Sequence, residues 1–234
     1  MSDLHIGFEE KFRGAGVSFD SNAESMGKEI SSLISSHRVT HLVINGDLKS
    51  STDRISSAEW ENIPKLFSKI PSNCSVTVIP GNHDGGLKHI LPERVEISSP
   101  AGILIDNNLI MHGHTKPISK FSNCKRMIIG HLHPIYQEKG SPLSGQALWV
   151  FLKLDRKKIF QDILNSDERD PLLDVLIMPS FNSDLVVAGY SRDAAKQERK
   201  TAPILKVLEE ASEAIVVTLG GEIIGDSSVL RRIL

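Results

Sequence analysis

The chain has 234 residues, of which 40% are hydrophobic and 24% charged, a composition typical of a folded globular protein and not of disordered or fibrous chains. The formal net charge of -2 argues against a protein that holds nucleic acid through a broadly basic surface, since such binding needs many Lys and Arg. The two cysteines, Cys74 and Cys124, are too few for a disulfide framework. The apolar stretches are far shorter than the ~20 residues of a membrane helix, and the pattern of a signal peptide is absent. We expect a cytoplasmic protein that does not span a membrane.

Helix and strand patterns alternate in the first part of the chain. Short apolar runs at 41–45 and 76–79 have the length and borders of strands. Helical patterns occupy 21–37 and 57–70. Ser21 and Glu24 have the spacing of a capping box at the start of the first helix. Pro64 predicts a late start or a kink in the second helix.

Strand patterns dominate the second part of the chain, where short turns at 106–108 and 219–222 predict hairpins. The polar stretch 191–201 is predicted to be a mobile segment or the exposed start of an amphipathic helix. Because helices and strands come first and mostly strands follow, we expect a single α/β domain over residues 1–234. Two packed mixed sheets would be flanked by helices. The predicted strands are 103–105, 109–111, 126–129, 147–154, 175–178 and 214–219.

Five short motifs contain nearly all the informative polar residues, including six of the nine histidines. Each motif lies just after a predicted strand or at its edge, where loops project side chains into a shared crevice. Residues two apart on an extended segment point to the same side, so the paired residues of a motif can face a common centre. The motifs are Asp3-Leu4-His5, Gly46-Asp47, Gly81-Asn82-His83-Asp84, His112-Gly113-His114 and Gly130-His131-Leu132-His133.

The ligand types in these motifs indicate which ions would bind. Carboxylate, imidazole and amide groups without a thiolate favour borderline ions such as Mn(II), Fe(II) or Zn(II) over soft ions. A cluster of this size could hold two cations.

The five motifs, in this order, resemble the full motif set of the calcineurin-like metallophosphoesterases. The segments SDLHIG, NGDLK, PGNHD, MHGH and IIGHLHP are most similar to the archaeal SbcD-related and DNA-ligase-associated phosphoesterases. GNHD combined with GHxH is specific, whereas any one motif alone is weak. The resemblance implies a four-layer α/β/β/α sandwich and a site with two divalent cations, most often Mn(II), with Fe, Zn or Ni as alternatives.

The resemblance also implies a role for each motif residue. Two cations would lower the pKa of a shared water, and the resulting hydroxide would attack a phosphate ester in line. His83 would stabilise the transition state or protonate the leaving oxygen, and Asp84 would fix its tautomer. One cation would take Asp3, His5 and His133, the other would take Asn82, His112 and His131, and Asp47 would bridge them.

Other polar residues keep two interpretations each. His114 is either phosphate-facing or a turn residue, and Lys49 either contacts a phosphate or is an ordinary solvated lysine. Residues 179–182 resemble a family segment near the cleft but form an ordinary loop sequence. Residues 156–158, Arg-Lys-Lys, predict a solvated turn rather than a nucleic-acid patch.

The start of the chain departs from the family pattern. In the family, the DxH motif ends a buried strand, whereas only Met1 and Ser2 precede Asp3 here. Either upstream residues are missing or this strand is absent, which would leave neighbouring backbone groups unpaired. We expect residues added upstream to raise stability and metal content.

The leading functional hypothesis is a dinuclear metal-dependent phosphoesterase acting on phosphodiester or nucleotide substrates, with a diester favoured over a monoester. An alternative is an SbcD-type DNA nuclease module, which would need a DNA-binding surface and a partner ATPase. A less favoured alternative is a non-catalytic scaffold that keeps the fold for protein contacts. The expected partner is a phosphate-ester substrate, nucleic acid stays open as a partner, and no protein partner can be named.

Overall fold

The computed structural model describes residues 1–13, 20–160, 171–187, 205–208 and 210–233. The predicted mobile segment at 191–201 lies outside these residues. Within the described residues, none of the helices has the length and apolar character needed to cross a membrane.

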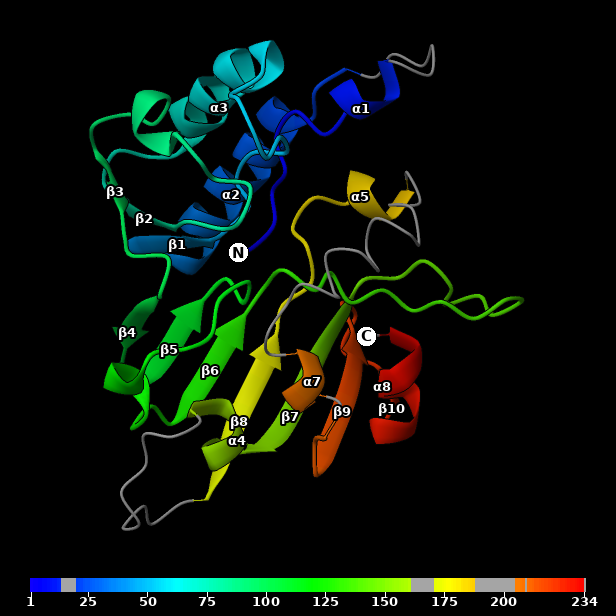
Figure 1. Ribbon diagram of the computed structural model, residues 1–234. Helices are drawn as coiled ribbons and strands as arrows, with labels where there is room; N and C mark the ends of the chain where they lie inside the picture. Colours follow the sequence, from blue (N-terminus) through cyan, green and yellow to red (C-terminus); the bar gives the residue numbers. More distant parts are fainter. Residues whose placement is uncertain (14–19, 161–170, 188–204, 209, 234) are drawn as a thin grey trace.

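The smaller sheet has three parallel strands in the order β1-β2-β3. Helices α2 and α3 cover one of its faces (Figure 1) and pack against it through a core that includes Ile30, Ile44, Ile63 and Val78. The amphipathic patterns of both helices bury one side of each helix, as expected. The bounds are α1 Glu10–Arg13, α2 Ala23–His37, β1 His41–Asn45, α3 Ser57–Lys69, β2 Ser75–Ile79, η1 Leu87–His89 and β3 Val95–Ile97.

The predicted capping box at the start of the first helix is wrong, whereas the second helix starts where its pattern predicts. Helix α2 has Asn22 at its N-cap and no side-chain cap bond, so Glu24 falls one residue too early for a capping box and pairs with Lys28 at 3.2 Å instead. Helix α3 starts at Ser57, as the pattern over 57–70 predicts, because Ser56 and Glu59 form a complete capping box. Pro64 therefore lies inside helix α3. Of the two effects expected of Pro64, the late start does not occur, and the kink stays a prediction.

The larger sheet has seven strands in the order β10-β9-β7-β8-β6-β5-β4. Strands β5, β6 and β8 are mutually parallel, and the other pairs are antiparallel. Helices α4, α7 and α8 lie on one face (Figure 1). The mixed α/β architecture with two sheets and helices is confirmed. The bounds are β4 Ile103–Ile105, β5 Asn108–Met111, η2 Ser119–Phe121, β6 Arg126–Ile129, β7 Leu148–Asp155, α4 Arg156–Phe160, β8 Leu172–Ile177, α5 Asp184–Val187, α7 Leu205–Leu208, β9 Glu213–Thr218, β10 Ile223–Gly225 and α8 Ser227–Ile233.

The prediction of a solvated turn at 156–158 is wrong for Arg156. This residue begins helix α4 and is buried. Its guanidinium donates hydrogen bonds to the carbonyl oxygens of Ser122 and Cys124, each at 2.7 Å. The planar guanidinium has several N–H donors in fixed directions, which suits carbonyl oxygens that converge on it. The positive charge of Arg156 is therefore buried together with hydrogen-bond acceptors.

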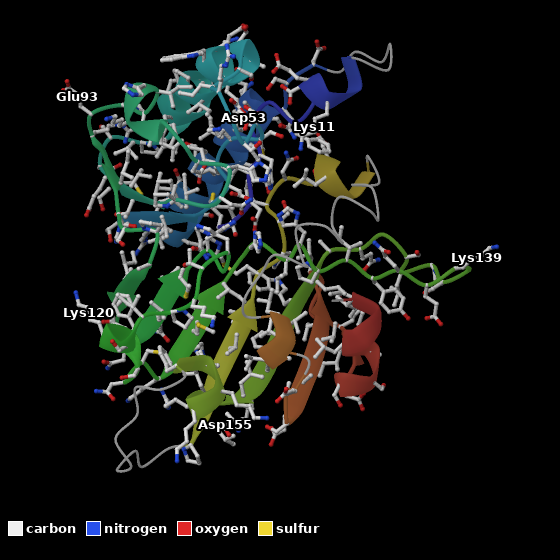
Figure 2. The ribbon with its side chains drawn as sticks, in the orientation of Figure 1. Lys11, Asp53, Glu93, Lys120, Lys139 and Asp155 are labelled. Atoms are coloured by element: carbon white, nitrogen blue, oxygen red, sulfur yellow. The ribbon has the colours of Figure 1, made fainter. Side chains whose placement is uncertain are left out.

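The two sheets meet where several strands end, and this position defines the site. The ends of β1 and β2 face the ends of β5, β6 and β8 (Figure 1). The segment at the start of the chain runs beside the end of β1, with the His5 N–H donating to the Asp47 carbonyl at 2.8 Å. Charged side chains such as Asp155 and Lys139 lie at the periphery, Lys139 near the tip of the loop between β6 and β7 (Figure 2).

Candidate metal centre

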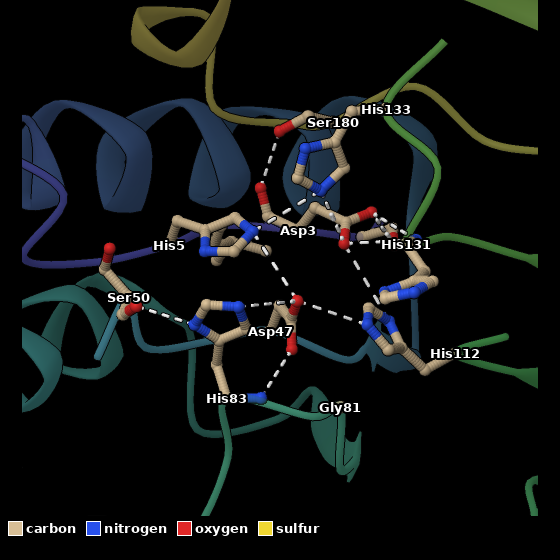
Figure 3. A network of polar contacts seen from close by, with 12 residues as sticks. Asp3, His5, Asp47, Ser50, Gly81, His83, His112, His131, His133 and Ser180 are labelled. Atoms are coloured by element: carbon tan, nitrogen blue, oxygen red, sulfur yellow. Dashed lines mark hydrogen bonds and ion pairs between the residues drawn. The ribbon is translucent and has the colours of Figure 1, made fainter. Parts of the chain in front are cut away.

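Loops from both sheets place carboxylate and imidazole side chains around one centre (Figure 3). Each loop follows a strand end or lies beside one, so the placement comes directly from the parallel strands of each sheet. The side chains are buried, with exposed fractions of 3% or less. They are Asp3 and His5 beside β1, Asp47 after β1, His83 after β2, His112 after β5, and His131 and His133 after β6.

The backbone at five of these residues is left-handed. This conformation costs about 1–2 kcal/mol for a residue with a side chain and persists only where surrounding contacts enforce it. One such contact is the His131 N–H, which donates to both carboxylate oxygens of Asp3 at 3.2 Å. The φ angles are 57° at Asp3, 44° at His5, 48° at Asp47, 67° at His131 and 41° at His133.

The first potential cation site contains Asp3, His5 and His133, whose candidate ligand atoms lie within 4.8 Å of one another. The Nε2 atom of His133 is 3.1 Å from Oδ1 of Asp3. The Nε2 atoms of His5 and His133 are 3.4 Å apart. This is the group expected for the first cation.

The second potential cation site contains Asp47, His112 and His131, again within 4.8 Å. The Nε2 atom of His112 is 3.2 Å from Oδ2 of Asp47. The same carboxylate oxygen is 3.6 Å from Nε2 of His5, which belongs to the first site. Asp47 therefore lies between the two groups, the position required of a bridging ligand.

The residues present fit a divalent cation. Both ring nitrogens of His131 are buried and have no hydrogen-bond partner among the described residues. A buried polar atom left in this way costs about 1–3 kcal/mol, and a cation would satisfy the one ring nitrogen that carries a lone pair. The carboxylate and imidazole donors suit Mn(II), Fe(II) or Zn(II).

Asn82 differs in exposure from the six buried side chains that form these two groups. It lies in the turn after β2, and its side chain is exposed. Ligation of a cation by Asn82 stays a prediction.

His83 is buried beside the centre, and its tautomer is fixed by a residue that the sequence analysis did not assign. Its Nδ1 atom lies 2.6 Å from the carbonyl oxygen of Ser50. Because a carbonyl only accepts, Nδ1 carries the hydrogen, and Nε2 is directed towards Asp47 at 3.9 Å (Figure 3). The prediction that Asp84 fixes this tautomer is wrong.

Asp84 instead joins two loops of the site. Its carboxylate accepts the backbone N–H of Leu48 at 2.9 Å, of Lys49 at 3.2 Å and of Gly81 at 2.8 Å. Burial and the nearby charge of Asp47 raise the pKa of Asp84 to about 6.

The metal-free site contains both charged and neutral imidazoles. Burial acts to lower the pKa of His112, but the carboxylate of Asp47 raises it to about 10. Burial and the charge of His112 lower the pKa of His131 to about 4. Although burial acts in the opposite direction, His133 lowers the pKa of Asp3 to about 2. At neutral pH Asp3 and Asp47 are therefore both carboxylates.

For Lys49 one of the two interpretations is wrong, whereas for His114 both stay open. The interpretation of Lys49 as a solvated lysine is wrong, because it is fully buried and its Nζ donates to the carbonyl of Ser51. The ring centroid of His114 is 5.3 Å from that of His112. Its Nδ1 atom is buried and has no hydrogen-bond partner in the part of the chain that the structure describes. A role of His114 facing the phosphate stays a prediction.

Several residues that support the centre were not predicted. The hydroxyl of Ser180 donates to the Asp3 carbonyl at 2.7 Å, and the side-chain amide of Asn182 donates to the Leu4 carbonyl at 2.8 Å. Ser2 donates to the Asp3 carboxylate. The only signal for this support was the loop at 179–182, which follows a strand and resembles a family segment near the cleft.

Comparison with known proteins establishes the family. The family model for the calcineurin-like phosphoesterases matches residues 1–153, and the chain therefore belongs to this family of phosphoester hydrolases. Among solved structures, the chain is similar to the Pseudomonas putida nuclease MPE, with a TM-score of 0.50 and 18% sequence identity over 78% of this chain and 73% of that chain. At this identity the similarity concerns the fold. No curated protein matches the chain.

Proposed function

We propose that this protein is a dinuclear metal-dependent phosphodiesterase. One observation carries the proposal: buried side chains from separate loops converge on one centre in overlapping groups of candidate ligands. The group of Asp3, His5 and His133 and the group of Asp47, His112 and His131 are joined by a third group, which contains His5, Asp47 and His83. Buried polar groups without partners are costly, and the nitrogens of His131 are such groups. Cation binding explains their retention in the interior.

When bound, two divalent cations would supply a water molecule of lowered pKa and neutralise the charge of the phosphate. Asp3, His5 and His133 would hold one cation, and His112, His131 and Asn82 the other, with Asp47 shared. We propose Mn(II) as the native ion, with Fe(II), Zn(II) and Ni(II) as alternatives.

His83 is the proposed catalytic residue. Its Nδ1–H is held by Ser50, so its Nε2 atom has a lone pair that can take a proton at the substrate; once the ring is protonated, Nε2–H can give a proton to the leaving oxygen or stabilise the developing negative charge as a donor. Asp84 acts indirectly by holding the backbone of both loops.

Hydrolysis of bis-p-nitrophenyl phosphate tests the proposal. Turnover should require Mn(II), disappear with excess chelator and fall by roughly 100-fold or more in His83→Ala. A matched control is His89→Ala, a change in the 3₁₀ helix η1 outside the centre, which should keep the wild-type rate. Lack of metal-dependent turnover by the wild type would contradict the assignment, and equal rates of wild type and His83→Ala would remove His83 from the mechanism.

A DNA nuclease is the second candidate, because the Pseudomonas putida protein with a similar fold is called a nuclease. Cleavage of labelled single-stranded and double-stranded DNA, compared with cyclic nucleotides, separates the two candidates. A nuclease should also bind DNA with an affinity that falls steeply as salt rises.

We propose that residues 1–234 form one domain in a cytoplasmic protein. Pairing of β8 with both β6 and β7 supports a single unit, because β8 follows the region matched by the family model. Limited proteolysis that released a stable fragment ending near residue 153 would contradict it.

A further inference from the structure

Glu59 is a fully buried carboxylate in the first turn of helix α3, and it lies outside both groups of candidate ligands. Its Oε1 atom accepts the N–H of Ser50 at 2.9 Å, the N–H of Ser51 at 2.7 Å and the hydroxyl of Ser51 at 2.6 Å. Its Oε2 atom accepts the N–H of Ser56 at 2.8 Å. Only the last contact belongs to the capping box, so the other three have a separate role.

The turn held by Glu59 also contacts the proposed catalytic residue. The N–H of Ser50 donates to Glu59, and the carbonyl of the same residue accepts the Nδ1–H of His83 at 2.6 Å. A chain of hydrogen bonds therefore runs from the Glu59 carboxylate through the backbone of Ser50 to the His83 ring. Hydrogen bonds to a buried carboxylate are stronger than neutral ones, so the carboxylate is well suited to hold this turn.

Neighbouring backbone leaves little freedom for the Glu59 side chain. A Cβ atom at Gly7 would lie 2.9 Å from Cγ of Glu59, and Gly7 is two residues after His5. Asp84 holds the same loop from its other end through the N–H of Lys49. The position of the Ser50 carbonyl is thus restricted from both sides.

We propose that Glu59 is a positioning residue for His83. It holds the Ser50 carbonyl so that His83 keeps its hydrogen on Nδ1 and presents Nε2 to the centre. The inference rests on the proposed function for its catalytic consequence, but the effect on the His83 tautomer is independent of turnover.

Glu59→Gln tests the proposal, with Ser56→Ala as the matched control. Glutamine has a similar size, but its amide N–H₂ faces backbone donors, and the turn must shift. With bis-p-nitrophenyl phosphate and Mn(II), kcat should fall about 10- to 100-fold, as for other residues that orient site groups, with KM changed by less than about 2-fold since substrate contacts remain. Ser56→Ala removes the cap bond to the Glu59 N–H but leaves the contacts with Ser50 and Ser51. It should lower the melting temperature and keep kcat.

A double-mutant comparison separates positioning from general damage. If Glu59 acts through His83, Glu59→Gln should cause no further loss of kcat when His83 is already alanine. An equal loss in both backgrounds, or an unchanged kcat in the single variant, would overturn the proposal.

Imidazole ¹⁵N NMR of the metal-free protein gives a readout besides activity. Wild-type His83 should show the Nδ1–H tautomer, and Glu59→Gln should shift it towards the Nε2–H form. Should Glu59→Gln fail to fold, Ser51→Ala, which removes only the hydroxyl contacts with Glu59, should give a smaller shift in the same direction. An unchanged tautomer in a folded variant overturns the inference even if turnover fails, whereas a lack of metal-dependent turnover by the wild type overturns only the proposed function.

Discussion

A methyl group at Gly81 should displace the shared carboxylate of the site. A Cβ atom at this position would lie 2.2 Å from Oδ1 of Asp47 and 2.5 Å from its backbone nitrogen, whereas real Cβ contacts essentially never fall below 3.0 Å. Residue 81 and Asp47 must therefore move apart by at least 0.8 Å, the difference between 3.0 and 2.2 Å. The backbone of Gly81 is outside the left-handed region, so alanine fits its conformation and the effect comes from this contact alone.

The size of the effect follows from the tolerance of metal sites. Ligand distances vary by only about 0.2 Å in a metal site, and a misplacement near 1 Å costs on the order of 100-fold in rate. Gly81→Ala should therefore bind less Mn(II) and lose roughly 100-fold or more in kcat. Forcing an extra carbon into a packed site costs about 1–3 kcal/mol, and each kcal/mol lowers the melting temperature of a protein of this size by about 2–4 °C.

Gly85→Ala is the matched control, because no atom of the described residues lies within 4 Å of its added Cβ. It should keep wild-type turnover, metal content and stability to within about 0.5 kcal/mol. The two variants are compared with the wild type by three measurements: metal content by mass spectrometry, turnover of bis-p-nitrophenyl phosphate and thermal unfolding. Near-wild-type activity and metal content in Gly81→Ala would refute the role given to Asp47.

The remaining predictions concern protons, metal and the larger sheet. His112 has a pKa of about 10 in the metal-free site, so it is protonated at pH 7.5 and a cation must displace the proton. The affinity for Mn(II) should therefore rise with pH below 10, and calorimetry in buffers of different ionisation enthalpy should detect about one proton released per cation bound. Equal binding enthalpies in all buffers would contradict this prediction. Mn(II) at about 100 times its dissociation constant should stabilise the fold by about 2.7 kcal/mol, and a melting temperature unaffected by Mn(II) or chelator would count against a bound cation. Arg156→Lys should cost about 2–3 kcal/mol by losing part of the donor fork while leaving kcat unchanged, and a large loss of turnover without a change in stability would contradict this structural role.

The position of the site was predictable because its residues follow strands. Asp47 follows β1, His112 follows β5 and His131 follows β6, and motifs at strand ends meet where parallel strands end. Asp3 and His5 are an exception, because they lie beside β1 and follow no strand. The division of the ligands into the group Asp3, His5 and His133 and the group Asp47, His112 and His131 comes from the resemblance to the family, not from the strand-end rule. Ligation by Asn82 stays a prediction that rests on the resemblance, since its side chain is exposed in the turn after β2.

The contacts that support the site could not be predicted in the same way. Ser50, Ser180 and Asn182 act through hydrogen bonds with backbone or side-chain groups far away in the sequence, and no local spacing identifies such pairs. Glu59 is intermediate: its spacing from Ser56 matches a capping box, yet its contacts with Ser50 and Ser51 depend on tertiary packing. Sequence spacing therefore predicts the capping contact of Glu59 with Ser56 but not its contacts with Ser50 and Ser51.

Backbone preference and chemistry conflict at the ligand positions, and the conflict explains why the site needs so many supporting contacts. Glycine adopts a left-handed backbone without cost, but it offers no side-chain donor to a cation. At Asp3, Asp47 and His131 a ligand is kept in this conformation at about 1–2 kcal/mol each, and surrounding hydrogen bonds hold the residue there. The Asp3 carbonyl accepts from Ser180, the Asp3 carboxylate accepts from the His131 N–H, and the Asp47 carboxylate accepts the N–H of His83 at 3.0 Å. Ligand side chains thus serve as acceptors that stabilise the backbone of neighbouring loops, so removal of one ligand should disturb the conformation of others as well as cation binding.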